Sequence, residues 1–312
     1  MFPLTATRPS RSHADGATTL GNMITRRAVF AAVGAGTSAM RKMLYSSSVR
    51  KGQAFAASLI ELEAASSGRL GVAVLSTTSG EVAGHRADER FAMCSTFKML
   101  LAAAVLRRSD SGLENLDRAV DVPIGPLLSN SPLTQEHAGS QMTLRDLCRA
   151  AIVRSDNTAA NLLLASLGGP PAISQFARAI GDYVTRLDRI ELALNEAAPG
   201  DPRDTTSPAA MLGNLKKLLL GDVLSAASRD HLTRWMVENQ TGNDRLRAGF
   251  PTHWRVADKT GSNAKNTTND IAVAWPPNQQ PILVSVYLTE CEGPEEKRNA
   301  VLAKVARLAA VL

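Results

Sequence analysis

The sequence predicts an α+β fold, in which both ends of the 312-residue chain build one antiparallel sheet flanked by helices, with an all-helical subdomain inserted between them. Two observations favour this fold. Apolar, β-branched segments occur near residue 70 and again after residue 250, whereas the stretch between them has mostly helical periodicity. Strands that are grouped apart from helices are typical of α+β proteins, so we expect the two groups to pair in one sheet.

The first elements follow in order from the residue pattern. Helical periodicity begins at Ala57 and ends near Gly68. Segment 70–77, Leu-Gly-Val-Ala-Val-Leu-Ser-Thr, predicts a strand. The turn residues Ser79-Gly80 follow it and predict a hairpin with a short strand that ends at His85.

The helical subdomain is expected from Ser95 to about Gly221. Thr143 begins one helix with a capping-box pattern, Thr-Leu-Arg-Asp, and Pro171 stands at the first turn of another. Residues 186–207 form the exception, because they are charged, rich in Pro and Asp, and without a period. Irregular loops of that length inside a domain are usually functional.

The C-terminal part returns to strands. A helix near 225–237 precedes predicted strands at 254–257, 270–275 and 281–288, and an amphipathic helix over 294–311 closes the chain. We therefore expect a single domain over 57–312. Its α/β part comprises about 57–93 and 237–312, and its helical part comprises about 94–236.

The basic character of the chain is confined to its first 56 residues. They hold eight of the 35 Lys and Arg residues and one of the 29 acidic residues, which gives +7. The remaining 27 basic and 28 acidic residues give −1 over 57–312. A charge of +6 spread over the fold would favour nucleic acid or an anionic membrane. Its confinement to one end argues against both partners for the folded part.

Residues 1–56 are typical of an export leader. Thr25-Arg26-Arg27-Ala28-Val29-Phe30 is a twin-arginine pattern, and the apolar segment 28–40 is too short for a bilayer anchor. Removal is expected after Ala54-Phe55-Ala56 or after Thr37-Ser38-Ala39, and Met23 is an alternative start. The leader predicts export to the periplasm. The alternative is a disordered tail in which two arginines meet by chance.

Cysteines and histidines exclude two kinds of site. Cys94, Cys148 and Cys291 are too few for a disulfide framework and allow one bridge at most. No Cys-x-x-Cys occurs, and the five histidines form no spacing typical of metal ligands. We therefore expect neither a metal nor a cofactor.

Ser95-Thr-Phe-Lys98 places a hydroxyl and an amine three residues apart. If a helix begins at Ser95, both side chains lie on one face, and Lys98 can accept or relay the Ser95 proton. A backbone N–H at the start of a helix can also stabilise an oxyanion. Taken alone, the pattern fits a capped helix with a solvated lysine equally well.

Two tripeptides complete a set of three motifs. Ser155-Asp156-Asn157 stands between two helical segments and by itself favours an N-cap cluster. Lys259-Thr260-Gly261 lies in a strand region and by itself favours a turn at the end of a strand. In this order after Ser-x-x-Lys, they form the motif set of class A β-lactamases and penicillin-binding proteins. From about residue 57 to its end, the chain resembles a class A serine β-lactamase, with the β-lactamase/transpeptidase-like fold of the penicillin-binding-protein-like serine acyltransferases.

Segment 186–204 distinguishes these two families. It resembles the class A omega loop, in which Glu191 and Asn195, four residues on, would hold the hydrolytic water. Arg189 and Asp204 match the buried ion pair that pins this loop. Penicillin-binding proteins lack the water-activating carboxylate, so Glu191 argues against the rival interpretation, a D,D-peptidase on the same fold.

The resemblance implies a role for each catalytic residue. Ser95 would be the nucleophile, and Lys98, Glu191 or both would take its proton; Glu191 would activate the water in deacylation. Ser155 would relay a proton to the lactam nitrogen, and the backbone N–H groups of Ser95 and Ser262 would form the oxyanion hole. A second rival, a non-enzymatic sensor or binding domain, is disfavoured because Ser95, Lys98 and Glu191 are intact.

The resemblance also implies how the substrate is held. Asn157 would bind its side-chain amide. Lys259, Thr260 and Ser262 would bind its carboxylate. Many members add an arginine where this chain has Thr268, and Arg245 stands where other members place a substitute.

Three departures from common members bear on the substrates. Cys94 precedes the nucleophile, as in several extended-spectrum and carbapenem-hydrolysing members, but the position of its bridging partner is Asn263, which argues against carbapenem hydrolysis. Asn130 stands where relatives often carry a gating aromatic residue, and Ser262 resembles cephalosporin-active members. We therefore expect a monomeric, periplasmic catalytic domain that hydrolyses small-molecule penicillins and cephalosporins and gives antibiotic resistance.

Overall fold

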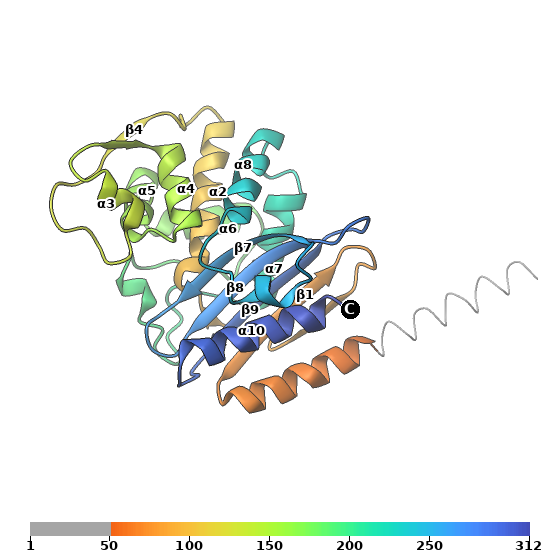
Figure 1. The fold of residues 1–312 in the computed structure, drawn as a ribbon. Helices are drawn as coiled ribbons and strands as arrows, with labels where there is room; N and C mark the ends of the chain where they lie inside the picture. The colour runs from red at the N-terminus through yellow and green to blue at the C-terminus, as the bar shows by residue number, and fades with distance from the viewer. Residues whose placement is uncertain (1–50) are drawn as a thin grey trace, which may run out of the picture. The chain divides into compact units, whose positions relative to one another are not determined.

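A five-stranded sheet organises residues 51–312, the part of the chain that the computed structural model describes (Figure 1). Its order is β2–β1–β9–β8–β7, and all neighbouring strands are antiparallel. The strands are β1 (Arg69–Ser76), β2 (Val82–His85), β7 (Arg255–Ser262), β8 (Thr268–Trp275) and β9 (Ile282–Thr289). Because β1 pairs with β9, with Val72 opposite Val286, both groups of strands form one sheet. The predicted α+β fold is confirmed.

Alternation along the strands gives this sheet two apolar faces. In β1, Leu70, Val72 and Val74 belong to one core cluster, whereas Ala73 and Leu75 belong to the other. Since successive side chains of a strand point to opposite faces, both faces of the sheet are covered by other elements.

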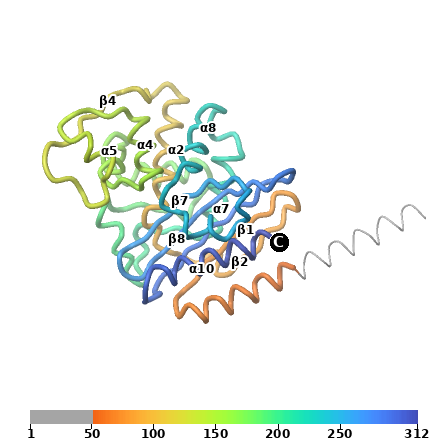
Figure 2. The backbone as a smooth tube through the Cα atoms, in the orientation of Figure 1, coloured from red at the N-terminus to blue at the C-terminus, as the bar shows by residue number. Residues whose placement is uncertain are grey.

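One face is covered by two helices from opposite ends of the described chain. Residues 51–66 are helical, and α10 (Glu295–Ala309) lies beside them, as Figure 2 shows. Phe55 and Leu59 share a core cluster with Leu302 of α10. The other face packs against α7 (Pro208–Leu215), which joins the sheet to the helical subdomain.

The helical subdomain is built around α2 (Phe97–Asp110), whose residues 97–106 are all buried. A helix that is apolar on every side lies inside a core. The helices that pack against it are α4 (Leu144–Val153), α5 (Asn157–Leu167), α6 (Pro171–Ala179) and α8 (Ala226–Val237). The predicted helix starts are confirmed, because the Thr143 side chain accepts a hydrogen bond from the Asp146 N–H and Pro171 is the first residue of α6.

Short elements distinguish the structure from the predicted one. β3 (Phe91–Ala92) pairs with β6 (Thr205–Thr206), and β4 (Ala119–Asp121) pairs with β5 (Gln141–Thr143). Strands of two or three residues are too short to show a periodic pattern. The remaining short helices are α3 (Pro132–Glu136), η2 (Ala193–Asn195), the π-helical turn η3 (Lys216–Leu220) and α9 (Leu246–Gly249).

The α2 helix begins later than predicted. Ser95 lies in a 3₁₀ turn, η1 (Cys94–Thr96), and α2 follows at Phe97. The 3₁₀ turn and helix are continuous in backbone direction, because Thr96 and Phe97 both have right-handed helical angles. Ser95 therefore still stands at the N-terminal end of a long helix.

Most of the predicted leader lies outside the described residues, including the twin-arginine pattern, Met23 and Thr37-Ser38-Ala39. The other predicted cleavage site, Ala54-Phe55-Ala56, lies within the helical residues, where Phe55 is buried. The boundary at residue 56 stays a prediction. Over residues 51–312, no helix has both the length and the apolarity to cross a membrane.

Candidate active site

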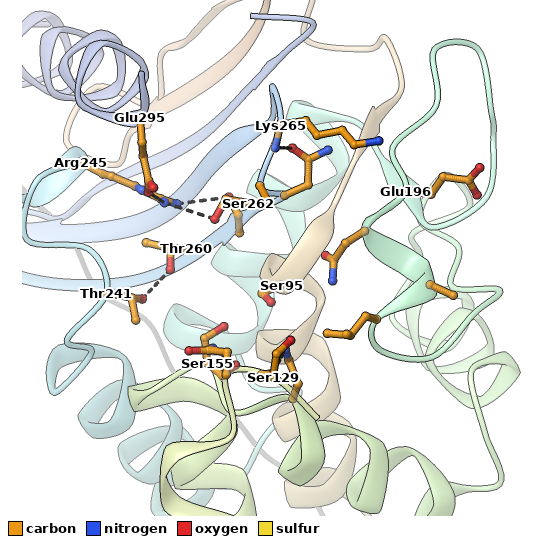
Figure 3. A pocket seen from close by; sticks show the side chains of 18 residues that line it. Ser95, Ser129, Ser155, Glu196, Thr241, Arg245, Thr260, Ser262, Lys265 and Glu295 are labelled. Atoms are coloured by element: carbon orange, nitrogen blue, oxygen red, sulfur yellow. Dashed lines mark hydrogen bonds and ion pairs between the residues drawn. The ribbon is translucent and has the colours of Figure 1, made fainter. Parts of the chain in front are cut away.

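A cavity of about 820 Å³ lies where β7, the helical subdomain and the loop 186–204 meet (Figure 3). All three motifs contribute to its wall. The lining includes Ser95, Ser155, Asn157, Thr260, Ser262, Asn195 and Arg245. Residues separated by as many as 200 positions, from Ser95 to Glu295, thus face one space.

The Ser95 hydroxyl lies between a cation and an anion. Its Oγ accepts a hydrogen bond from Lys98 Nζ at 3.0 Å and donates one to Glu191 Oε1 at 3.3 Å. Lys98 Nζ and Glu191 Oε1 are themselves 2.9 Å apart. Either group is therefore within reach of the hydroxyl proton, as a general base must be.

The Lys98 amine is completely buried, and its contacts join two of the motifs. It donates to the backbone oxygen of Ser155 at 2.8 Å and to Asn157 Oδ1 at 2.6 Å. Burial lowers the pKa of Lys98, and the attraction of Glu191 only partly offsets this effect. A lysine with a lowered pKa gives up its proton more easily, which favours a role in proton transfer.

Ser155 links the first and third motifs. Its Oγ accepts a hydrogen bond from Lys259 Nζ at 3.1 Å and lies 3.5 Å from Lys98 Nζ. Burial and the nearby Lys98 charge lower the pKa of Lys259 well below its usual value. A hydroxyl between two amines of lowered pKa can pass a proton in either direction.

Asp156, the middle residue of its motif, has the structural role that its sequence position favours. Its carboxylate caps α5 by accepting the Ala159 N–H at 2.9 Å, and it also accepts the Leu133 and Thr134 N–H groups at 3.0 Å each. These bonds fix the turn between α4 and α5. This turn places Ser155 and Asn157 at the wall of the cavity.

Glu191 is held by amide side chains on both sides. Asn195 Nδ2 donates to Glu191 Oε2 at 2.5 Å. Asn161 brackets the Glu191 backbone, donating to its carbonyl at 2.9 Å and accepting its N–H at 2.9 Å. The sequence reasoning missed Asn161. Its one available signal was its position on α5 four residues after Asn157, which puts both side chains on the same helix face.

The predicted ion pair of the loop is formed. Arg189 Nε lies 2.5 Å from Asp204 Oδ2, and the Asp204 side chain is 1% exposed. Asp204 also accepts the backbone N–H groups of Asp188 and Arg189 at 2.7 and 2.9 Å. Asp204 thus joins the end of the loop to residues 188–189 near its start. Glu191 and Asn195 lie in the segment between these two points.

Gly261 allows β7 to approach the backbone at Ser95 closely. A Cβ atom at this position would lie 3.0 Å from the Ser95 nitrogen and 2.6 Å from the Met93 oxygen. Those distances exclude any side chain without a shift of the backbone. The residue that follows, Ser262, thereby lies beside Ser95 at the wall of the cavity.

Arg245 lines the same cavity as Thr260 and Ser262. Its Nη2 is 3.4 Å from Ser262 Oγ. Thr268, the position of the arginine in other members, instead accepts a hydrogen bond from Arg298 Nε at 2.9 Å. Glu295, which the sequence reasoning did not single out, also contacts Arg245 and lines the cavity.

The three cysteines are free and buried. Burial raises the pKa of Cys94 to about 12, so its thiol stays protonated beside Ser95. At the position of the absent bridging partner, Asn263 Oδ1 accepts the N–H groups of Lys265, Asn266 and Thr267. Over residues 51–312, no cluster of three or more His, Cys, Asp and Glu side chains could hold a metal ion.

Comparisons with known proteins agree with this geometry. A family model described as the β-lactamase enzyme family matches residues 54–311. The chain is similar to β-lactamase L2 of Stenotrophomonas maltophilia, at 53% identity over 249 residues, covering 80% of this chain and 82% of that relative. It is 48% identical over 250 residues to β-lactamase CTX-M-8 of Citrobacter amalonaticus, covering 80% and 86%. Among solved structures, an ancestral class A β-lactamase is 59% identical with a TM-score of 0.81, covering 82% of this chain and 99% of that one.

Proposed function

The chain belongs to the class A β-lactamases, which hydrolyse the β-lactam ring, and on this premise we propose that Ser95, Lys98, Ser155 and Glu191 catalyse the hydrolysis of penicillins and cephalosporins. The observation that carries the proposal is the position of the Ser95 hydroxyl, 3.0 Å from Lys98 Nζ and 3.3 Å from Glu191 Oε1.

Acylation begins with attack of Ser95 Oγ on the lactam carbonyl carbon. The hydroxyl proton passes to Lys98, to Glu191, or to one through the other, because both groups are within reach of Oγ. The negative charge that develops on the carbonyl oxygen is stabilised by the backbone N–H groups of Ser95 and Ser262.

The ring opens when the tetrahedral intermediate collapses. The bond between the carbonyl carbon and the lactam nitrogen breaks, and the nitrogen takes a proton from Ser155. Ser155 regains a proton from Lys98 or Lys259, whose Nζ atoms lie 3.5 and 3.1 Å from its Oγ. The acyl group is now an ester of Ser95.

Deacylation needs an activated water. Glu191 accepts a proton from a water held by Glu191 and Asn195, and the resulting hydroxide attacks the ester carbonyl. The bond between Ser95 Oγ and the acyl carbon then breaks, and Oγ regains a proton from Glu191, directly or through Lys98, which leaves Glu191 as a carboxylate again. The 2.5 Å hydrogen bond between Asn195 Nδ2 and Glu191 Oε2 supports this assignment, because it holds the carboxylate while its other oxygen lies 3.3 Å from Ser95 Oγ.

The binding groups match an anionic bicyclic substrate with an amide side chain. Lys259, Thr260, Ser262 and Arg245 would receive the carboxylate, and Asn157 would receive the amide. The Asn157 side chain is preoriented, since its Oδ1 accepts from Lys98 and its Nδ2 donates to the Ser129 oxygen at 2.8 Å. Cys94 is free, whereas the carbapenem-hydrolysing members that this chain resembles bridge this cysteine, so its free state argues against carbapenem hydrolysis.

Turnover of nitrocefin by the purified enzyme tests the catalytic proposal. We expect rapid hydrolysis by the wild type and a stable adduct on Ser95 in the Glu191→Gln variant, detected by mass spectrometry. A single turnover by the wild type would instead support a D,D-peptidase. Full turnover by a Ser95→Ala variant would refute the assignment of the nucleophile.

Class A β-lactamases are secreted or periplasmic. We propose that this enzyme is a monomer in the periplasm and that a twin-arginine leader within residues 1–56 directs its export. A chain with Arg26→Lys and Arg27→Lys should stay in the cytoplasm, as measured by activity in separated fractions. Periplasmic activity of that double variant would refute the leader. Mass spectrometry of the mature enzyme distinguishes removal after Ala39 from removal after Ala56.

A further inference from the structure

The five N–H donors of Arg245 all have partners in the structure. Nε donates to Asn299 Oδ1 at 3.0 Å, and Nη1 donates to the backbone oxygens of Gly261 and Asn269 at 3.2 and 2.9 Å. Nη2 lies 3.0 Å from Glu295 Oε1 and 3.4 Å from Ser262 Oγ. A guanidinium has five donors and no more, so none is left for an additional acceptor.

The partners of Arg245 differ in how firmly they are held. Gly261 and Asn269 contribute backbone oxygens of two adjacent strands, which hold the buried guanidinium in place. Glu295 is different, because its side chain is 56% exposed whereas that of Arg245 is 6% exposed. The Glu295 carboxylate can therefore leave Nη2 for solvent, whereas Arg245 cannot move away from it.

The contact lies at the substrate-binding end of the cavity. Arg245, Ser262 and Glu295 all line the cavity, and Figure 3 shows the Arg245 side chain between Glu295 and Ser262. A substrate carboxylate that approaches Ser262 meets Nη2, which already donates to the Glu295 carboxylate at 3.0 Å. Carboxylates that share one guanidinium donor exclude one another.

We propose that Glu295 is a specificity-determining residue that competes with the substrate carboxylate for Arg245 Nη2. This inference rests on the proposed function, in which Arg245 receives that carboxylate. Glu295 weakens the binding of substrates with a carboxylate beside the lactam nitrogen, and leaves the binding of neutral analogues unchanged. It neither touches the reacting atoms nor alters the acyl-enzyme chemistry.

Glu295→Gln tests the proposal, because it keeps the shape and the acceptor oxygen but removes the charge. We expect KM for a penicillin to fall by about 1.5-fold to fivefold, the range for loss of one exposed ionic competitor, with kcat unchanged. The methyl ester of the same penicillin should show no change in KM. Glu296→Gln is the matched control, since both glutamates lie in the first turn of α10 and Glu296 does not line the cavity.

The second arm repeats the substitution in an Arg245→Ala background. There the fall in KM should disappear, because the guanidinium for which Glu295 and the substrate carboxylate compete is absent. An equal fall would mean that Glu295 acts by repelling the substrate, and would overturn the proposal. An unchanged or raised KM in Glu295→Gln alone would also overturn it, because Glu295 would then only position Arg245. Absence of lactam hydrolysis by the wild type would refute the proposed function instead.

Discussion

Lys98 Nζ lies 2.9 Å from Glu191 Oε1, and neither side chain has any exposed surface. The two residues come from α2 and from the loop 186–204, so the contact joins the helix that follows Ser95 to the loop that carries Glu191 and Asn195. Two charges buried together depend on each other, because removal of either leaves the other without compensation. Stability and catalysis are therefore coupled at this pair.

Lys98→Ala should impair both properties. Loss of a positioned base typically slows proton transfer by about 10²–10⁴-fold, so we expect acylation by nitrocefin to slow by that order in stopped-flow measurements. Glu191 is then left buried without its cation, which costs roughly 3–5 kcal/mol when the group stays charged. Thermal unfolding measures that cost, and Lys216→Ala, an exposed lysine of the same subdomain, is the control. An acylation rate like that of the wild type would assign the proton transfer to Glu191 alone.

Asp204→Asn should slow deacylation more than acylation. Asn keeps an acceptor for the Asp188 and Arg189 N–H groups but cannot compensate the Arg189 charge. The loop loosens, and Glu191 and Asn195 lose their alignment. We expect the acyl-enzyme to accumulate in mass spectra taken during turnover, with a stability loss of about 3 kcal/mol. For the unfolding measurement, Glu196→Gln is the comparison, because Glu196 pairs with the same arginine but is 58% exposed. Equal losses in the two variants would contradict the importance of burial.

Asn263→Ala should widen the turn between β7 and β8. The Asn263 side-chain oxygen accepts three successive N–H groups, and their loss leaves these donors to water. Ser262 precedes this residue, and we propose its N–H for the oxyanion hole, so we expect kcat for a cephalosporin to fall by about tenfold, or roughly 1.4 kcal/mol. Asn263→Asp restores the acceptor and should recover most of the rate. Failure of Asp to recover activity would assign another role to the side chain.

The motifs made it predictable that Ser95, Lys98 and Ser155 come together, because their spacing fixes local geometry. Ser95 and Lys98 share a helix face even though the first residue lies in a 3₁₀ turn. Lys259 lies within β7, which extends to Ser262 and is therefore longer than the strand predicted over 254–257. Asn161 and Glu295 could not be found in the same way. Each acts through the packing of a helix against a distant segment, and the spacing of Asn161 from Asn157 was the one local signal of that packing in the sequence.

The short ribbons escaped prediction for a related reason. β3 pairs Phe91 with Thr206 across more than a hundred residues, and neither strand is long enough to show alternation. The pairing of β3 with β6 nevertheless matters for the site. Directly beside it, the Met93 N–H donates to the backbone carbonyl oxygen of Asp204 at 2.9 Å. The end of the loop is thus tied to the segment that leads into Ser95.

Glu63→Gln should destabilise the enzyme above pH 4.5 but not near pH 2. Burial raises the pKa of Glu63, but hydrogen bonds from Arg86, Leu70 and His85 outweigh it and lower the pKa from 4.5 to about 2. The folded state therefore prefers the charged form, and this stabilisation is lost as pH falls from 4.5 towards 2. We expect a loss of roughly 2 kcal/mol at pH 7 in denaturant unfolding. Glu61→Gln, exposed on the same helix, should show no such loss, and a pH-independent difference would contradict the mechanism.

The pH dependence of substrate binding should report Lys259. Burial and the Lys98 charge lower the pKa of Lys259 well below 10.5, so the amine loses its proton at a lower pH than an exposed lysine. Only the protonated form attracts a carboxylate. KM for a penicillin should therefore rise with pH on the alkaline side, beginning below pH 10.5, while the methyl ester of that penicillin shows no rise. Lys259→Arg keeps its charge over this range, because a guanidinium does not deprotonate there, and the rise should move to higher pH. Steady-state kinetics from pH 6 to about pH 10 measure both curves. An identical alkaline rise in the arginine variant would assign the titration to another group.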